Sequence, residues 1–129
     1  MKTLNTKNIV TLHDMLIEKI GGVKGVLNFG SLDAAVHAPF QSFGGVDLYP
    51  TIQEKASRLC YSLISNHPFV DGNKRGGVLA MLTFLKVNGI ELNCTNNDLI
   101  KLGLSIAEGK SKYEDVTTWV NKHCKENCK

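Results

Sequence analysis

The sequence predicts an all-α fold, a single-domain helical bundle with one candidate β-hairpin. Apolar residues recur at three- and four-residue spacing along most of the 129 residues, which is the period of an amphipathic helix. Residues that start and stop helices separate these stretches. Only residues 41–50 place paired glycines between short apolar pieces, a pattern typical of a hairpin.

The first predicted helix runs from about Thr6 to Ile20, and Gly21-Gly22 ends it. After a glycine-punctuated loop, Ser31 is the predicted N-cap of a second, short helix. We assign structural roles to the histidines of these helices, His13 and His37, because neither has a second chemical group near it in the sequence. The apolar stripes of the two helices comprise Ile9, Leu12, Leu16 and Ile20, and then Leu32, Ala35 and Val36.

The segment Gln41 to Pro50 follows, with Gly44-Gly45 at its centre. It fits a hairpin-like flap, and its composition fits a plain connector equally well. Thr51-x-x-Glu54 is then a capping box that opens a helix to about Asn66. The buried stripe of that helix comprises Ala56, Leu59, Cys60, Leu63 and Ile64.

A helix from about Asn73 to Asn88 is apolar on nearly every side, so we expect it to be the central helix, packed all round. Thr95 or Asn96 caps the next helix, which Gly109 ends. A last helix starts at about Ser111, and residues 123–129 are expected to fray. The chain therefore reads as one domain over residues 1–129.

Composition and charge exclude several classes of protein. A formal net charge of +3 is mild, and no basic run with interleaved aromatic residues indicates a nucleic-acid partner. No 18-residue apolar segment indicates a membrane span, and the first residues lack the apolar core of a signal peptide. We expect a cytoplasmic protein.

The four cysteines do not form a metal or disulfide pattern. Cys124 and Cys128 share a helical face that could assist a metal, but no second pair occurs at zinc-finger spacing. In a cytoplasmic chain they are expected to be reduced thiols, without an assigned function.

The chemistry is concentrated in the segment H-P-F-V-D-G-N-K-R, residues 67–75, where one helix should stop and the next begin. Pro68 disfavours helix at its own position and before it, and Gly72 can adopt backbone angles that other residues avoid. The new helix presents free N–H groups and a positive dipole end, which suit an anion. Lys74 and Arg75 add positive charge, so the segment predicts a phosphate site.

Asp71 would repel a phosphate unless a divalent cation lies between them. Mg²⁺ is commonly held by one or two carboxylates together with substrate phosphate oxygens. Histidine titrates near neutral pH, so His67 could accept a proton from an incoming hydroxyl. The segment thus combines a base, a carboxylate for a metal ion and a binding site for phosphate. Phosphoryl and nucleotidyl transfer use these three groups.

The same residues also make a good connector between helices, with Asn66 as C-cap, Pro68 as stop and Asp71-Gly72 as turn. Two features count against a connector alone. A turn does not need His, Lys and Arg together. Nor does it need Gly76 and Gly77 in the first turns of a helix, where each costs about 1 kcal/mol relative to alanine. Paired glycines indicate that something approaches the backbone closely.

His67-x-Phe69-x-Asp71-Gly72-Asn73-Lys74-Arg75 resembles the Fic-domain signature H-x-F-x-[D/E]-G-N-G-R. It is closer to the death-on-curing (Doc) toxin branch of the Fic/Doc (Fido) family, in which Lys replaces the last Gly. Further landmarks of this likeness, over about residues 5–122, are Leu12-His13-Asp14, Gly21-Gly22, Gly25, residues 32–36, Phe84-Leu85 and Asn88-Gly89. The resemblance implies a Fic/Doc-like helical bundle, in which residues 41–50 form a flap that holds the target's backbone beside the active site.

The resemblance also implies the reaction. Doc-type toxins with this lysine are protein kinases that transfer the γ-phosphoryl of ATP to a threonine of elongation factor Tu and so arrest translation. By this likeness His67 is the catalytic base and Asp71 the Mg²⁺ ligand. The phosphates of ATP would be held by Gly72, Asn73, Lys74 and Arg75. The alternatives are a Fic-type AMP transferase acting on a protein hydroxyl, and a non-catalytic binding module.

Two departures from the wider family pattern bear on these alternatives. Fic signatures continue with a second Arg, where this chain has Val78, which favours the kinase over the AMP transferase. An inhibitory [S/T]-x-x-x-E-[G/N] stretch is also missing, since the nearest match, residues 104–109, begins with Leu104. We therefore expect a Phd-like antitoxin, a partner chain with a disordered tail that folds on the toxin.

Overall fold

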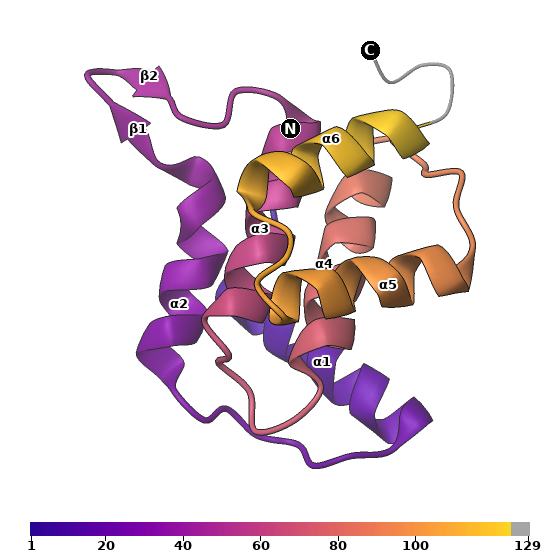
Figure 1. Cartoon of the computed structure of the whole chain (residues 1–129). Helices are drawn as coiled ribbons and strands as arrows, with labels where there is room; N and C mark the ends of the chain where they lie inside the picture. Colours follow the sequence, from indigo (N-terminus) through magenta and orange to yellow (C-terminus); the bar gives the residue numbers. More distant parts are fainter. Residues whose placement is uncertain (125–129) are drawn as a thin grey trace.

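The computed structural model describes residues 1–124, which form six α-helices, one 3₁₀ turn and a two-stranded hairpin (Figure 1). The all-α prediction is confirmed, and so is the small hairpin. In chain order the elements are α1 (Thr6–Ile20), α2 (Phe29–His37), η1 (Ala38–Phe40), β1 (Ser42–Phe43), β2 (Val46–Asp47), α3 (Ile52–Ser65), α4 (Asn73–Val87), α5 (Asn96–Ala107) and α6 (Tyr113–His123).

The helix boundaries follow local capping signals closely. Thr51 caps α3 as predicted, since its hydroxyl accepts from the Glu54 N–H at 3.0 Å and its own N–H donates to the Glu54 carboxylate. Thr95 caps α5 in the same way. The prediction for α2 was wrong: Asn28 is the N-cap and accepts from the N–H of Ser31, so the helix begins at Phe29.

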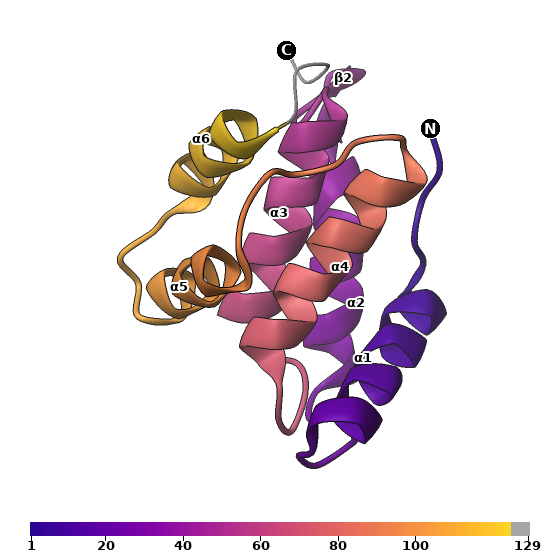
Figure 2. The ribbon, with the colours of Figure 1, turned by 90° about the vertical axis from the view of Figure 1, so that its right-hand side faces the viewer.

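Helices α3 and α4 lie side by side in the middle of the molecule (Figure 2). On one side they are flanked by α5 and α6, and on the other by α1 and α2. The expectation that α4 alone is central needs correction. Helix α3 packs against α2, α4, α5 and α6, whereas α4 packs against α1, α3 and α5 and its last residue, Val87, is 37% exposed.

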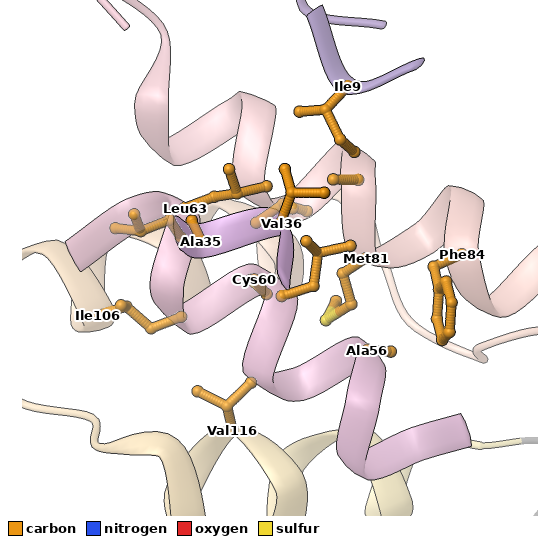
Figure 3. Close-up of a cluster of buried hydrophobic side chains, with 14 of the residues drawn as sticks. Ile9, Ala35, Val36, Ala56, Cys60, Leu63, Met81, Phe84, Ile106 and Val116 are labelled. Carbon is orange, nitrogen blue, oxygen red and sulfur yellow. The ribbon is translucent and has the colours of Figure 1, made fainter. Parts of the chain in front are cut away.

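One apolar core joins all six helices (Figure 3). Side chains of α3 and α4 form its centre, among them Cys60, Leu63, Met81 and Phe84. The outer helices add Ile9, Val36, Ile106 and Val116, each at most 4% exposed. Because both ends of the α3–α4 pair are fixed by this core, the loop between them has a rigid base.

The hairpin pairs Ser42 with Asp47 and Phe43 with Val46 in antiparallel register. Gly44 and Gly45 both have positive φ, 58° and 81°, as the tight hairpin turn requires. Below it, Lys55 of α3 is only 3% exposed; its ammonium donates to the Tyr49 carbonyl and lies 3.4 Å from the Asp47 carboxylate. A buried cation thus anchors the hairpin to the start of α3.

At the other end of the chain, His123, where the predicted frayed tail begins, is still part of α6. Cys124 forms an isolated bridge with Leu92. Residues 125–129, including Cys128, lie outside the described residues. Burial raises the pKa of the Cys60 thiol to about 12, so that thiol stays protonated in the core. No helix within residues 1–124 is long and apolar enough to cross a membrane.

Candidate active site

A pocket of about 430 Å³ opens where α1 and α3 end and α4 begins, with the last turn of α5 beside it. Its volume is in the range of small-molecule sites. The apolar part of its wall is formed by Ile17, Ile20, Ile64 and Ala107. The pocket brings together all six residues predicted from the sequence: His67, Asp71, Gly72, Asn73, Lys74 and Arg75.

His67 occupies an unusual backbone conformation directly after α3. Asn66 is the C-cap of the helix, and His67 then has φ of 50°, the only positive φ of a non-glycine residue in the described part of the chain. This left-handed conformation, common for glycine after a helix, costs a non-glycine residue about 1 kcal/mol or more. The side chain is exposed and lines the pocket, as a base that must reach a substrate requires.

The carboxylate of Asp71 is held by two backbone N–H groups. Oδ1 accepts from Gly72 at 2.9 Å, and Oδ2 accepts from Val23, in the loop after α1, at 3.1 Å. A Cβ on Gly22 would lie 2.7 Å from Oδ2, so the glycine that follows α1 makes room for this carboxylate. The sequence identified Gly22 as a helix stop and as a landmark of the family likeness, but did not show that it contacts Asp71.

The environment of Asp71 fits a shared Mg²⁺ ion. Each carboxylate oxygen accepts one N–H and keeps lone-pair capacity, and the residue is exposed to the pocket. No group of three or more His, Cys, Asp or Glu that could hold a metal occurs among residues 1–124. A single carboxylate suits an ion that takes its other ligands from phosphate and water.

The first turn of α4 is open at its N-terminus. Gly72 is the N-cap, in the left-handed conformation with φ of 73°, and no side chain caps the turn. The leading N–H groups of a helix have no acceptor within it, so here they remain available to an anion. Lys74 and Arg75 line the same pocket, and neither takes part in an ion pair within the described residues. Lys74 and Arg75 therefore add positive charge beside these N–H groups.

Asn73 is buried, whereas the next two residues, Lys74 and Arg75, are exposed. Its side chain is 6% exposed, and its amide makes two bonds to the backbone of Phe69: Oδ1 accepts from the N–H at 2.9 Å and Nδ2 donates to the carbonyl at 3.0 Å. The amide therefore closes the loop between α3 and α4. The backbone N–H of Asn73 is one of the leading N–H groups of α4 and remains available to a ligand.

A strap formed by residues 22–28, the connection between α1 and α2, runs along the motif loop. Val70 donates to the Gly25 carbonyl at 3.1 Å, and both Leu27 and Asn28 donate to the Pro68 carbonyl. Val26 and Phe69 form an antiparallel bridge. The sequence predicted a glycine-punctuated loop here but gave no sign that it pairs with the motif.

Residues 3–85 match the family model described as the Fic/DOC family, which covers well over half of the chain. The chain belongs to the Fic/DOC family.

Two relatives are similar to this Fic/DOC chain. A protein named Toxin Doc, from Mycolicibacterium smegmatis, is 49% identical over 72 residues, 56% of this chain and 55% of the relative. The chain thus spans about half the length of that protein. A protein named Protein kinase doc, from Escherichia phage P1, is 24% identical over 116 residues, 90% of each chain. The resemblance to the Doc branch is confirmed.

One expectation drawn from the Fic/Doc resemblance does not match this structure. The hairpin lies at the N-terminal end of α3 (Figure 1). The pocket lies at the C-terminal end of the same helix. At 1.5 Å per residue, the 14 residues of α3 separate the two by about 21 Å. None of the described hairpin residues lines the pocket, so the hairpin is not a flap over this site here.

The glycines at the start of α4 were expected to mark a close approach to the backbone, and the structure identifies what approaches. A Cβ on Gly77 would lie 2.6 Å from Ile64 and 3.2 Å from the Cys60 carbonyl, both in α3. A Cβ on Gly76 would lie 3.3 Å from the ring of His13 in α1. The approach of α3 therefore accounts for Gly77, and Gly76 lies in close contact with α1.

Proposed function

We propose that this chain is the toxin of a toxin–antitoxin pair and acts as a Mg²⁺- and ATP-dependent protein kinase. Its acceptor would be a threonine or serine hydroxyl of a translation factor, with elongation factor Tu as the expected target in the cytoplasm. The names of the two relatives support the proposal, since one is called a toxin and the other a protein kinase.

The observation that carries the proposal is the composition of the pocket. One cavity of about 430 Å³ holds an exposed imidazole, a carboxylate fixed by backbone N–H groups and a helix N-terminus without a side-chain cap. Lys74 and Arg75 line it too, and neither forms an ion pair within residues 1–124. Phosphoryl transfer requires mainly positioning and charge stabilisation, which these groups can supply.

Each residue has a definite part in this reaction. His67 accepts the proton of the acceptor hydroxyl as its oxygen bonds to the γ-phosphorus and the bond from that phosphorus to ADP breaks. Lys74, Arg75 and the first N–H groups of α4 bind the negative phosphate oxygens. Asp71 would hold Mg²⁺, which when bound supplies charge neutralisation.

The main alternative is transfer of AMP, as in Fic-type enzymes. Lys74 places a charged stem in the phosphate cradle where the Fic signature has glycine, and its side chain is exposed to the pocket. Val78, 8% exposed in α4, stands where the signature has a second Arg, so one phosphate ligand of an AMP-transferring site is missing. Both residues favour the kinase.

Labelled ATP separates the two reactions. The purified protein is incubated with Mg²⁺, a bacterial lysate and ATP labelled on either the α- or the γ-phosphorus. We expect label on a protein from γ only. Label from α would establish AMP transfer instead, and label from neither, with a folded protein, would leave a binding module.

The matched controls are two histidine variants. His67→Ala should lower the transfer rate by at least about 100-fold, the usual contribution of a general base. His37→Ala removes an exposed imidazole of α2, outside the pocket, and should leave the rate unchanged. Equal rates in both variants would remove His67 from the mechanism.

An antitoxin would restrain this activity. Because Leu104 stands where the inhibitory pattern requires Ser or Thr, restraint would come from another chain, a Phd-like antitoxin whose tail folds on the toxin. Expression of the chain alone should stop growth, and His67→Ala should restore it.

A further inference from the structure

His13, in the middle of α1, contacts the loop between α3 and α4. It lies 58 residues before Asp71 in the sequence. Its ring is 2% exposed and stacks on the ring of Phe69, with centroids 3.7 Å apart and planes 3° from parallel. Its Nε2 lies 2.7 Å from the carbonyl oxygen of Asp71. One imidazole therefore contacts both the buried aromatic residue and the acidic residue of the motif.

The ring also contacts the glycines on which α4 starts. A Cβ on Gly72 would lie 3.3 Å from Nε2, and one on Gly76 would lie 3.3 Å from Cδ2. Both distances are tighter than ordinary van der Waals contact. The imidazole thus packs directly against the backbone of the N-cap and the first turn.

The proton on this ring can be placed from its partner. A carbonyl oxygen only accepts, so Nε2 must carry the hydrogen that it donates to Asp71. Nδ1 is then an acceptor, and it is buried with no hydrogen-bond partner among residues 1–124. A buried polar atom without a partner is unfavourable in a core, which an apolar ring of similar size would avoid. The donated bond is the reason we see for a histidine here.

We propose that His13 is a positioning residue that fixes the peptide between Asp71 and Gly72, and through it the carboxylate of Asp71. Rotation of that peptide would displace the Gly72 N–H, which bonds Oδ1 of Asp71. It would also move Asp71 relative to Val23, whose N–H bonds Oδ2. The role in metal binding rests on the proposed function, whereas the role in holding the loop does not.

Two substitutions separate positioning from packing. His13→Gln keeps an N–H donor near the place of Nε2 but loses the stack on Phe69. His13→Phe keeps the ring and the stack but loses the donor. His37→Phe, on the exposed side of α2, is the matched control.

The first measurement is amide hydrogen exchange in the full chain without ligand. We expect the protection of the Val23 and Gly72 amides to fall about tenfold in His13→Phe, the factor that one hydrogen bond is worth, and less than threefold in His13→Gln. Unchanged protection in His13→Phe, or a larger loss in His13→Gln, would assign His13 to packing alone.

The second measurement is nucleotide affinity. The Kd for Mg²⁺-ATP should rise about tenfold in His13→Phe and recover in His13→Gln, while the Kd for ATP without metal stays within twofold in both. An equal rise with and without Mg²⁺ would overturn the link to the carboxylate. If the native chain binds no Mg²⁺-ATP while the exchange pattern holds, the proposed function fails and the positioning role stands.

The third measurement needs no substitution and covers the case in which a variant does not fold. Nitrogen chemical shifts of the native imidazole distinguish its two tautomers. A hydrogen on Nε2 of His13 is expected, and a neutral ring with its hydrogen on Nδ1 would contradict the proposal.

Discussion

The side chain of Asn73 shows how a single residue of the motif differs from its neighbours. From its place in the sequence motif, Asn73 was expected to bind the phosphates of ATP together with Lys74 and Arg75. In the structure its amide is buried and makes both of its bonds to the backbone of Phe69. The sequence gives residue types but does not show which of them points into the pocket.

Replacement of Asn73 by leucine tests this role. The volume is similar, but the N–H and carbonyl of Phe69 lose their partners in a buried place, so the free energy of unfolding should fall by about 2–4 kcal/mol. Urea denaturation measures the change. Asn121→Leu, on the exposed side of α6, should stay within about 0.5 kcal/mol. A similar small effect of Asn73→Leu would mean that the amide is not needed to close the loop.

The contact of His13 with the site could not be predicted from the sequence. All six residues of the candidate site could be found because they lie within nine positions of each other. His13 lies on another helix, and only the packing of α1 against α4 brings it to Asp71. Its neighbours in sequence carried no sign of this contact beyond the landmark Leu12-His13-Asp14.

At the scale of elements, helix ends were predictable because their signals are local. The range Thr6–Ile20 of α1 and the capping box of α3 need only residues a few positions apart. The central place of α3 was not predictable, because Lys55, Ser57 and Ser62 are polar residues of types that are mostly exposed. All three are buried, and the Ser57 hydroxyl donates to the Gln53 carbonyl one turn earlier.

The contact between α3 and α4 makes a sharp prediction about Gly77. In Gly77→Ala the new Cβ would meet Ile64 at 2.6 Å and the Cys60 carbonyl at 3.2 Å, so the helices must move apart. We expect a loss of about 1–3 kcal/mol in the free energy of unfolding, as is typical of overpacking. Because Ile64 also lines the pocket, nucleotide affinity should fall as well.

Gly103→Ala is the control for Gly77→Ala. Gly103 lies in α5, and a Cβ there would make ordinary van der Waals contact with α4, 3.5 Å from Lys74 and Val78. Alanine favours helix over glycine by about 1 kcal/mol, so this variant should be neutral or more stable. Thermal denaturation of both variants compares them directly. A stabilised Gly77→Ala would show that the two helices are not in close contact there.

At the scale of the molecule, α3 joins two ends with different surfaces. Its C-terminal end meets the polar pocket, and its N-terminal end carries a hairpin with Phe43 82% and Val46 69% exposed. The residues of the pocket could be predicted from the sequence, and the hairpin was one of two interpretations that residues 41–50 fitted equally well. The separation of hairpin and pocket also follows from the sequence, because the helix predicted from Thr51 to about Asn66 lies between them. The Fic/Doc resemblance, and not the helix pattern, led us to expect a flap beside the site.

This separation predicts that the hairpin can be altered without effect on the pocket. Phe43→Ser with Val46→Ser removes two exposed apolar side chains, so stability should change by less than about 0.5 kcal/mol for each. The Kd for Mg²⁺-ATP, measured by calorimetry, should stay within twofold of the native value, since the residues between the hairpin and the pocket remain packed in the core. A tenfold weaker Kd would mean that the hairpin reaches the nucleotide in solution, by a movement across the length of α3. If affinity holds but transfer to a protein target is lost, the hairpin contacts the target at a distance from the reacting groups.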